Sequence, residues 1–220
     1  MNEIVRYYDK LAKDYDQNRF GNSYGKYIDT QERNILNKLL NKKSEFIIDL
    51  ACGTGRFLEY AQMGIDASSE MIKLAKNKFP DKEFLHNDAD DIKLDNNSVD
   101  TIICFHLFMH LNEEKTINIL NECHRILKPG GRIIFDFPSQ KRRKLLGYKT
   151  QNWHGAFSMQ LSDLKISQIN LKLNKSFGIL FLPIHRFPKS MRSIFIKIDN
   201  LFCNSFLKEY SSYLIVEMKK

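Results

Sequence analysis

The sequence predicts an α/β fold of the Rossmann-like, doubly wound type, with a mostly parallel sheet, N-terminal helices and a C-terminal elaboration. Between Phe46 and Phe137, short apolar runs alternate with helical patterns five times. This alternation favours parallel strands with helices on both faces. The first apolar run ends in the small-residue turn 51–55, which contains Gly53 and Gly55. A glycine-containing turn after a first strand is typical of domains that bind a nucleoside.

The expected elements follow from periodicity and capping residues. The first 40 residues repeat apolar side chains at helical spacing, and strands are expected at 46–50, 63–66, 83–85, 99–105 and 132–137. A brief helical stretch is expected after Gly55. Ser68 and Asn112 are expected to cap the next two helices, the second of which stops at 128–131, where Pro and Gly cannot continue it.

The segment after Pro138 has a different texture. It contains a basic loop, a short helix near Ser162, an extended run over 172–183, an amphipathic helix from Pro188 and a last strand near 213–218. Met191, Ile194, Phe195, Ile198, Leu201 and Phe202 recur at helical spacing in that helix. An apolar face of this kind is expected to cover the sheet edge or a pocket, with solvated lysines outside.

Composition excludes several classes of protein. The longest uncharged apolar stretch, Ser176–Ile184, is far shorter than the ~20 residues that span a bilayer. The N-terminus mixes charges from the start and does not resemble a signal peptide. The four cysteines fit neither a metal pair nor a disulfide framework, so reduced thiols and a cytoplasmic location are expected.

The charge is divided unevenly along the chain. Residues 1–136 hold 19 Lys+Arg and 22 Asp+Glu, a net charge of −3, whereas residues 137–220 hold 15 and 4, a net charge of +11. The basic segment includes the run 141–144. This concentration of positive charge indicates that the segment meets an anionic substrate or an anionic membrane surface. It would also attract nucleic acid, but without sequence specificity.

Acidic residues stand at or just after the ends of three expected strands: Asp49, Asp66 and Asp88. Ligands of doubly wound sheets bind beyond those strand ends. A dinucleotide fingerprint is absent, because the sixth position counted from Gly53 is Leu58. No phosphate-cradling P-loop is present either. A carboxylate at the first strand end suits an ammonium group better than a phosphate.

These residues resemble the class I S-adenosylmethionine-dependent methyltransferases. The likeness covers residues 1–137 well and the remainder weakly, and five further segments occur in the family's order. The first-strand motif is Asp49–Gly55 (DLACGTG), and the others are Tyr7–Asp16 (YYDKLAKDYD), Gly64–Ile72 (GIDASSEMI), Asn87–Ala89 (NDA), Asp95–Asp100 (DNNSVD) and Leu127–Gly131 (LKPGG). Two departures are Ala51 in place of the first glycine and the short interval between Gly55 and Asp66.

The resemblance implies S-adenosylmethionine as the cofactor and a role for each residue of the motifs. Gly53 and Gly55 would let the cofactor approach the backbone closely, beside Ala51. Asp49 would bind its ammonium group. Asp66, with Ala67, would bind the ribose. At the adenine, Asp88 and Ala89 would bond the ring edge and Met71 would pack on its face. The methionine end is assigned to Phe105, Tyr15 and Arg19.

The acceptor is expected beside the end of the fourth strand, where His106 is the candidate base. His110 lies four residues further on and could share a helix face with it. No third ligand at useful spacing accompanies this pair, so no metal is predicted. The residues expected around the acceptor are His110, Trp153, His154, His185 and Arg186.

The sequence thus predicts one domain over 1–220, with N-terminal helices (1–43), a cofactor-binding core (44–137) and a basic part (138–220) that completes the sheet and the acceptor pocket. The predicted reaction methylates an oxygen or nitrogen of a small-molecule, lipid-linked or glycan-linked acceptor. Two alternatives stay open: a nucleic-acid methyltransferase and a non-catalytic protein that binds S-adenosylmethionine. Against the first, there is no Asn/Asp-Pro-Pro-aromatic tetrapeptide and no RNA module.

Overall fold

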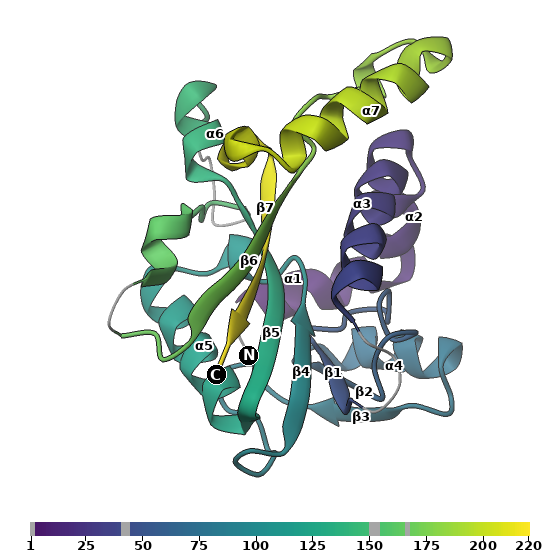
Figure 1. Ribbon diagram of the computed structural model, residues 1–220. Coiled ribbons are helices and arrows are strands. Elements are labelled where there is room, and N and C mark those ends of the chain that lie inside the picture. The colour runs from purple at the N-terminus through teal and green to yellow at the C-terminus, as the bar shows by residue number, and fades with distance from the viewer. Residues whose placement is uncertain (1–2, 41–44, 150–154, 166–167) are drawn as a thin grey trace.

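The computed structural model describes residues 3–40, 45–149, 155–165 and 168–220. They form a seven-stranded sheet in the order β3-β2-β1-β4-β5-β7-β6 (Figure 1). The strands β1 to β5 run parallel, and β7 lies antiparallel between β5 and β6. The strands are β1 (Ile47–Leu50), β2 (Met63–Asp66), β3 (Glu83–His86), β4 (Val99–Cys104), β5 (Leu127–Pro138), β6 (Lys172–Ile179) and β7 (Tyr213–Lys219). The predicted Rossmann-like fold class is confirmed.

The helices cover both faces of the sheet and its upper edge in Figure 1. They are α1 (Glu3–Leu11), α2 (Tyr15–Phe20), α3 (Ser23–Leu39), α4 (Ser69–Lys78), α5 (Glu113–Ile126), α6 (Gln140–Leu145) and α7 (Arg192–Cys203). Both predicted caps are confirmed. The Met71 amide donates to Ser68 Oγ (3.1 Å), and the Lys115 amide donates to Asn112 Oδ1 (2.9 Å).

Short 3-10 segments join these helices and strands. They are η1 (Ala12–Asp14), η2 (Phe108–His110), η3 (Leu161–Lys165), η4 (Ile184–Arg186), η5 (Lys189–Met191) and η6 (Phe206–Tyr210). The short helix expected near Ser162 is η3. The strand expected near 213–218 is β7.

The connection between β1 and β2 differs from the prediction. The expected helical stretch after Gly55 was wrong, because residues 53–60 form successive turns. Residues 51–62 make the whole crossover, close to the minimum that joins two parallel strands, and little chain is left for a regular helix. Strand β5 also begins earlier than expected, at Leu127, with a shift of register between Val99 and Thr101 of β4.

Two apolar clusters hold the layers together. One joins α5 to the sheet through residues such as Ile102, Ile119 and Phe135. The other joins α3 to the opposite face through Leu36, Ile103 and others. All four residues of β1 are buried, as expected of a central strand covered on both faces. The carboxyl ends of these rigid strands therefore form a fixed edge for a site.

Helix α7 contacts the edge strand β6, as the sequence suggested, but only part of its apolar face is covered. It runs along one end of the molecule, past the end of α3 (Figure 1). Phe195 and Phe202 do pack inward, on Phe187 and Phe181 respectively. The rest of the apolar pattern is solvent-exposed: Met191, Ile194, Ile198 and Leu201. The expectation that the whole apolar face would be covered was wrong for this row.

One buried carboxylate anchors α7 to α3. Asp199 is fully buried and accepts hydrogen bonds from Tyr27 Oη (2.8 Å), Gln31 Nε2 (2.8 Å) and the Leu182 amide (2.6 Å). Two of these hydrogen-bond donors belong to α3, and the third is a backbone amide in the segment that precedes α7. The bonds therefore hold α7 against α3. No helix in the described part of the chain has the length and apolar content to cross a bilayer.

The Asp199 anchor leads to a stability prediction. Asp199→Ala leaves three donors without their acceptor in the interior, so the free energy of unfolding should fall by about 2–4 kcal/mol. Urea unfolding followed by circular dichroism measures the change. Asp81→Ala, at an exposed position, is the control. A loss below ~0.5 kcal/mol for Asp199→Ala would show that these bonds do not anchor the helix.

Candidate functional site

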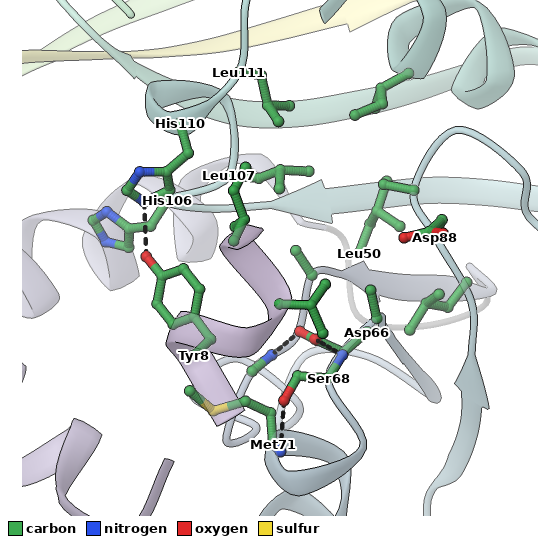
Figure 2. A pocket seen from close by; sticks show the side chains of 18 of the residues that line it. Tyr8, Leu50, Asp66, Ser68, Met71, Asp88, His106, Leu107, His110 and Leu111 are labelled. Carbon is green, nitrogen blue, oxygen red and sulfur yellow. Dashed lines mark hydrogen bonds between the residues drawn. The ribbon is translucent and has the colours of Figure 1, made fainter. Parts of the chain in front are cut away.

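A pocket opens at the carboxyl ends of β1, β2 and β4, beneath α1 (Figure 2). Asp88 lies at one end and His106 at the other, with Asp66, Ser68 and Met71 between them. Of the residues predicted to bind the cofactor, the pocket is lined by Tyr15, Ala51, Gly53, Asp66, Ala67, Met71, Asp88, Ala89 and Phe105. The structure thus brings together residues that are far apart in the sequence.

Asp66 and Gly53 face each other in this pocket. Asp66 Oδ2 accepts from the Gly53 amide (2.7 Å), and Oδ1 accepts from the Ser68 amide (2.8 Å). Each carboxylate oxygen keeps a second lone pair for a ligand hydroxyl. Gly53 has φ +52°, and a Cβ built on it would meet no atom within 4 Å. Its bare side therefore leaves open space where a ligand can approach the backbone.

Gly55 has a different surrounding. A Cβ on Gly55 would lie 2.9 Å from Leu58 Cδ1 and 3.3 Å from Ala75 Cβ. Its φ of +87° is also one that favours glycine. The expectation that Gly55 makes room for the cofactor is not supported, because the space it leaves is filled by packing against α4.

Asp49 lies just behind the pocket wall. It is 1% exposed, and its Oδ2 has no hydrogen-bond partner in the described structure. Burial raises the pKa of Asp49 to about 8, with a further contribution from Asp66 and opposition from Arg56. An unpartnered buried carboxyl beside the first turn fits a cationic group that brings its own positive charge.

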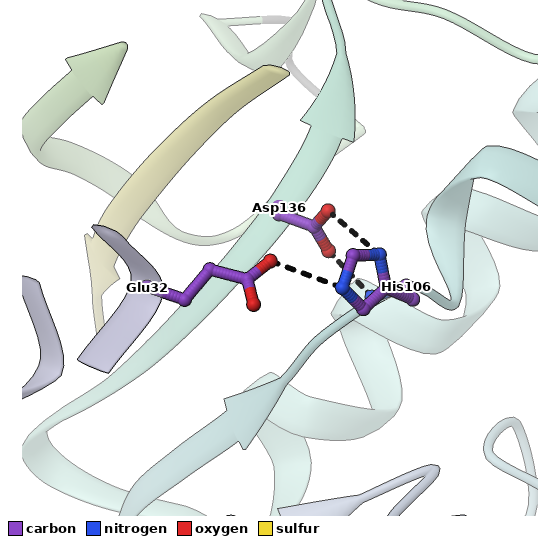
Figure 3. A group of neighbouring side chains, drawn as sticks. All are labelled: Glu32, His106 and Asp136. Atoms are coloured by element: carbon purple, nitrogen blue, oxygen red, sulfur yellow. Dashed lines mark hydrogen bonds and ion pairs between the residues drawn. The ribbon is translucent and has the colours of Figure 1, made fainter. Parts of the chain in front are cut away.

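His106 lies between two buried carboxylates at the other end of the pocket (Figure 3). Its Nε2 is 3.0 Å from Glu32 Oε1, and its Nδ1 is 3.6 Å from Asp136 Oδ2. The His106 amide donates to Asp136 Oδ1 at 2.6 Å. This bond holds a backbone φ of +61°, a conformation that non-glycine residues rarely adopt.

The two carboxylates differ in their ionisation. Burial opposes ionisation of Glu32, but Arg56 and His106 outweigh it and lower the pKa of Glu32 to about 2. Arg56 Nη1 lies 2.6 Å from Glu32 Oε2 and 2.9 Å from Asp29 Oδ1. Burial raises the pKa of Asp136, against the attraction of His106. The cluster therefore places one carboxylate beside each nitrogen of the His106 ring.

Glu32, His106 and Asp136 are also close enough together to be considered as possible ligands of a metal ion. One ligand atom each of Glu32, His106 and Asp136 lies within 4.8 Å of the others. The sequence prediction of no metal rested on spacing near His110, and spacing could not reveal this group. Because the two carboxylates face different nitrogens of one ring and Glu32 already pairs with Arg56, we interpret the cluster as a group that orients the His106 ring.

A second hollow adjoins the His106 end. It is lined by Tyr7, Tyr8, Leu11, Tyr15, Asn18, Arg19, His106, Met109 and His110. Phe20 and Tyr213 flank the His106 ring at 6.1 and 6.3 Å between centroids. No carboxylate of the described residues forms an ion pair with Arg19. The hollow is thus an aromatic chamber with one cation, suited to a planar ligand or an anionic group.

The residues expected around the acceptor are placed unevenly. His110 is buried in the wall, where Nε2 lies 2.7 Å from Tyr8 Oη and Nδ1 accepts from the Gly155 amide (3.1 Å). His185 and Arg186 lie in η4 and do not line either hollow; His185 instead packs against Tyr24. Trp153 and His154 lie outside the described residues.

Sequence reasoning missed four residues of the site: Tyr8, Glu32, Arg56 and Asp136. A signal was present for two of them. Asp136 interrupts the apolar run 133–137, and Glu32 occupies the same helical stripe as Ile28, Ile35 and Leu39. A charged residue at a position that periodicity assigns to the interior indicates a buried partner. Nothing in the local sequence of Tyr8 or Arg56 distinguishes them.

Comparisons with known proteins agree with the geometry. Residues 48–135 match the family model described as a methyltransferase domain. An uncharacterized protein of Methanocaldococcus jannaschii is 39% identical over 134 residues, which cover 60% of this chain and 50% of that protein. A demethylmenaquinone methyltransferase of Thermotoga maritima is 30% identical over 139 residues, with 59% of each chain covered. The chain therefore spans between half and three-fifths of these relatives' lengths.

Solved structures share the fold over nearly the whole chain. A methyltransferase of Thermotoga maritima described as dependent on S-adenosylmethionine superposes with a TM-score of 0.75 at 15% identity, covering 99% of this chain and 100% of that one. A magnesium protoporphyrin IX methyltransferase of Synechocystis, solved with S-adenosylmethionine bound, gives a TM-score of 0.66 at 15% identity, covering 99% and 95%. At these identities the likeness concerns the fold.

The raised pKa of Asp49 predicts a pH-dependent stability. A buried acid with a folded-state pKa near 8 favours the folded state at low pH, and that contribution is lost as the pH rises toward 8. The Asp49→Asn variant has no ionisable group at this position. Its free energy of unfolding, minus that of the parent, should therefore increase from pH 5 to pH 8, by at most ~1.4 kcal/mol per pH unit. Thermal unfolding of both proteins across this range measures it, with exposed Asp95→Asn as control. A constant difference would contradict the assignment.

Proposed function

Because the chain belongs to the class I S-adenosylmethionine-dependent methyltransferase family, whose methyltransferase domain its residues 48–135 match, we propose that it methylates a small planar acceptor beside His106. The observation that carries this proposal is the buried cluster of Glu32, His106 and Asp136 at the end of the pocket opposite Asp88. An imidazole held between two carboxylates at that end is positioned to take a proton from the acceptor.

The pocket residues fit the family's cofactor. S-adenosylmethionine supplies an electrophilic methyl group on a sulfonium when it is bound. Asp66 offers free lone pairs on an oriented carboxylate for the ribose hydroxyls, and Gly53 leaves the approach open. Asp49 would receive the ammonium group, and Asp88 with Ala89 would bond the adenine. Arg19, with Tyr15 beside it, would meet the cofactor carboxylate at the His106 end.

His106 is proposed as the base. Its Nδ1 has no hydrogen bond within the described structure, since Asp136 Oδ2 is 3.6 Å away. Glu32 faces Nε2 and, because its pKa is low, offers a negative charge to the imidazolium that forms when Nδ1 takes the proton. The Asp136 bond to the His106 amide keeps the ring in place during this transfer. The chain's own contribution is thus an oriented proton acceptor beside an aromatic chamber.

The aromatic chamber favours a ring-bearing acceptor. Tyr8 and Tyr15 form an edge-to-face contact in its wall, with Phe20 packed behind Tyr15, and a planar ring can pack against the two tyrosines. A ring hydroxyl loses its proton to the base and becomes a phenolate, which is nucleophilic at oxygen. An amine acceptor would use the same base to lose its proton. We therefore propose O- or N-methylation of a small molecule, either free or carried on a lipid or glycan.

A second candidate is methylation at a ring carbon. The similarity to a demethylmenaquinone methyltransferase favours it, since a phenolate shares its negative charge with the adjacent ring carbons. The same deprotonation by His106 serves both outcomes. Chemical derivatisation of the free hydroxyl before mass spectrometry distinguishes them, because an O-methyl product lacks the hydroxyl that a C-methyl product keeps.

The first functional prediction concerns Asp66. Asp66→Ala should weaken S-adenosylmethionine binding by roughly 1.5–3 kcal/mol, or about 10- to 150-fold, because hydrogen bonds to a charged acceptor are lost. Isothermal titration calorimetry measures this, with NAD as a ligand expected not to bind. Asp95→Ala, an exposed acid that does not line the pocket, should bind as the parent does. Unchanged affinity in Asp66→Ala would remove this residue from the binding site.

The second functional prediction concerns His106. His106→Ala should lower turnover by ~10²–10⁴ while cofactor affinity changes little, since the imidazole acts on the acceptor proton. Release of S-adenosylhomocysteine with hydroxylated aromatic acceptors measures turnover. His124→Ala on α5, outside both hollows, is the control. Parent-like turnover of His106→Ala at saturating acceptor would reduce His106 to a wall residue. Cofactor binding without turnover in the parent, with every acceptor class, would favour the non-catalytic alternative.

A further inference from the structure

A row of apolar side chains on α7 and at Met191, the residue just before it, is exposed to solvent. Met191, Ile194, Ile198 and Leu201 are 45%, 61%, 37% and 69% exposed. Their spacing puts them on one side of the helix, opposite the anchor residue Asp199 and the buried Cys203. Single exposed apolar residues are ordinary, but a continuous row on one helix marks a surface that another body covers.

The row continues onto the neighbouring segments. Phe206 of η6 is 88% exposed, and Leu145 and Leu146 at the end of α6 are each 65% exposed. Contacts join the three segments: Phe202 of α7 stacks on Phe181 at 4.7 Å, and Arg142 of α6 lies 5.9 Å from the Phe181 ring centroid. Arg142 Nη1 also donates to the Tyr210 carbonyl of η6 (3.2 Å).

We call these exposed residues the apolar crest and define it as Leu145, Leu146, Ile194, Ile198, Leu201 and Phe206. Helices α6 and α7 lie at the same end of the molecule, where β5 ends (Figure 1). That is also the end of the sheet at which His106 follows β4. The crest and the pocket therefore share one edge of the sheet.

The crest is bordered by positive charge. Lys144, Lys149, Arg186, Lys189 and Lys197 are exposed, and none forms an ion pair with a described carboxylate. The two acids of this region are already used: Glu209 pairs with Lys141 at 2.7 Å, and Asp199 is buried. The positive charge beside the crest is thus not neutralised by the described parts of the chain.

The basic run 141–144 contributes less to this surface than the sequence suggested. Lys141 pairs with Glu209, and Arg142 bonds the Tyr210 carbonyl. Arg143 donates to the carbonyls of Gly155, Ala156 and Phe157. Only Lys144 of the four is exposed. The run mainly fastens α6 to the body and so presents Leu145 and Leu146 at its tip.

We propose that the apolar crest docks this protein on an anionic phospholipid bilayer. Its aliphatic and aromatic side chains would enter the headgroup boundary, while the bordering lysines would lie beside lipid phosphates. A second copy of the chain is a poorer occupant, because its own unpaired lysines would be brought against these. A nucleic acid would use the lysines but leave the leucine, isoleucine and phenylalanine side chains in water.

The surface also bears on the acceptor. Helix α7 is bound through Asp199 to Tyr27 and Gln31 of α3, the helix that carries Glu32 beside His106. Docking at the crest would therefore hold the site at a fixed height above the bilayer, suited to an acceptor carried by a lipid. This statement about the acceptor rests on the proposed function, whereas binding to the bilayer does not.

Cosedimentation with vesicles tests the docking. The vesicles consist of phosphatidylcholine alone or of an equimolar mixture with phosphatidylglycerol, at low and high salt. Two variants remove the two features separately: Lys189→Glu with Lys197→Glu for the charge, and Ile194→Ser with Leu201→Ser for the apolar row. Lys38→Glu with Lys73→Glu makes the same change of charge at exposed positions on α3 and α4 and is the matched control.

The parent and the control should bind the anionic vesicles, and far less the neutral ones. The charge variant should lose at least tenfold in binding at low salt, since each basic residue near such a surface contributes ~1 kcal/mol. The Ile194/Leu201 variant should lose binding at both salt concentrations. Equal binding of all proteins to both vesicles would overturn the proposal. The proposal would also be overturned if the parent were a dimer in sedimentation velocity and the Ile194/Leu201 variant were a monomer, because the crest would then be an interface between two copies of the chain.

Turnover of a water-soluble acceptor separates this proposal from the proposed function. Both crest variants keep every residue of the two hollows, so their turnover should equal that of the parent. Absence of turnover in all proteins, with intact vesicle binding, would sink the proposed function and leave the docking surface standing. Normal turnover without vesicle binding would overturn the docking proposal and leave the proposed function standing.

Discussion

The buried pairing of Glu32 with Arg56 and with the His106 ring is the interaction on which the site depends. An ionised carboxylate without solvent contact costs several kcal/mol unless charged groups surround it. Arg56 comes from the turn that follows β1, His106 from the end of β4, and Glu32 from α3. The chain cannot keep Glu32 charged in the interior unless these three segments meet. The shape of the pocket's deeper end follows from that requirement.

Local strain at His106 belongs to the same arrangement. A positive φ at a non-glycine residue costs ~1–3 kcal/mol and persists only where the surroundings determine it. The bond from its amide to Asp136 and the contact of its ring with Glu32 do so here. Arg56 also lies over the rings of Phe20 and Phe57, which keeps its charge near Glu32 without a water shell. The position of the His106 ring is thus fixed by its contacts with Glu32 and Asp136 and, through Arg56, by the packing of Phe20 and Phe57.

Features encoded within a few residues could be predicted from the sequence. The caps at Ser68 and Asn112, the parallel sheet implied by alternation, and the meeting of Gly53, Asp66 and Asp88 at one edge follow from local patterns and the geometry of parallel sheets. The Glu32–His106–Asp136 cluster could not, because its members are joined only by tertiary packing across α3, β4 and β5. The exposure of α7 could not either, since periodicity shows that a helix has an apolar face but not whether the chain covers it.

Helix α1 forms the roof of the pocket, yet it has no fully buried residue of its own. Ile4 packs against the core and Tyr8 contacts aromatic rings, and the other contacts that hold this stretch of chain are polar: Tyr8 with His110, Asp9 with Ser68, and, just beyond the helix, Asp16 with Thr54 and Lys78. Such contacts can be exchanged for water at little net cost, whereas leaving an apolar core would be expensive. We therefore expect this roof to open at a lower free-energy cost than the sheet, which would give a bound ligand a way out that leaves the core folded.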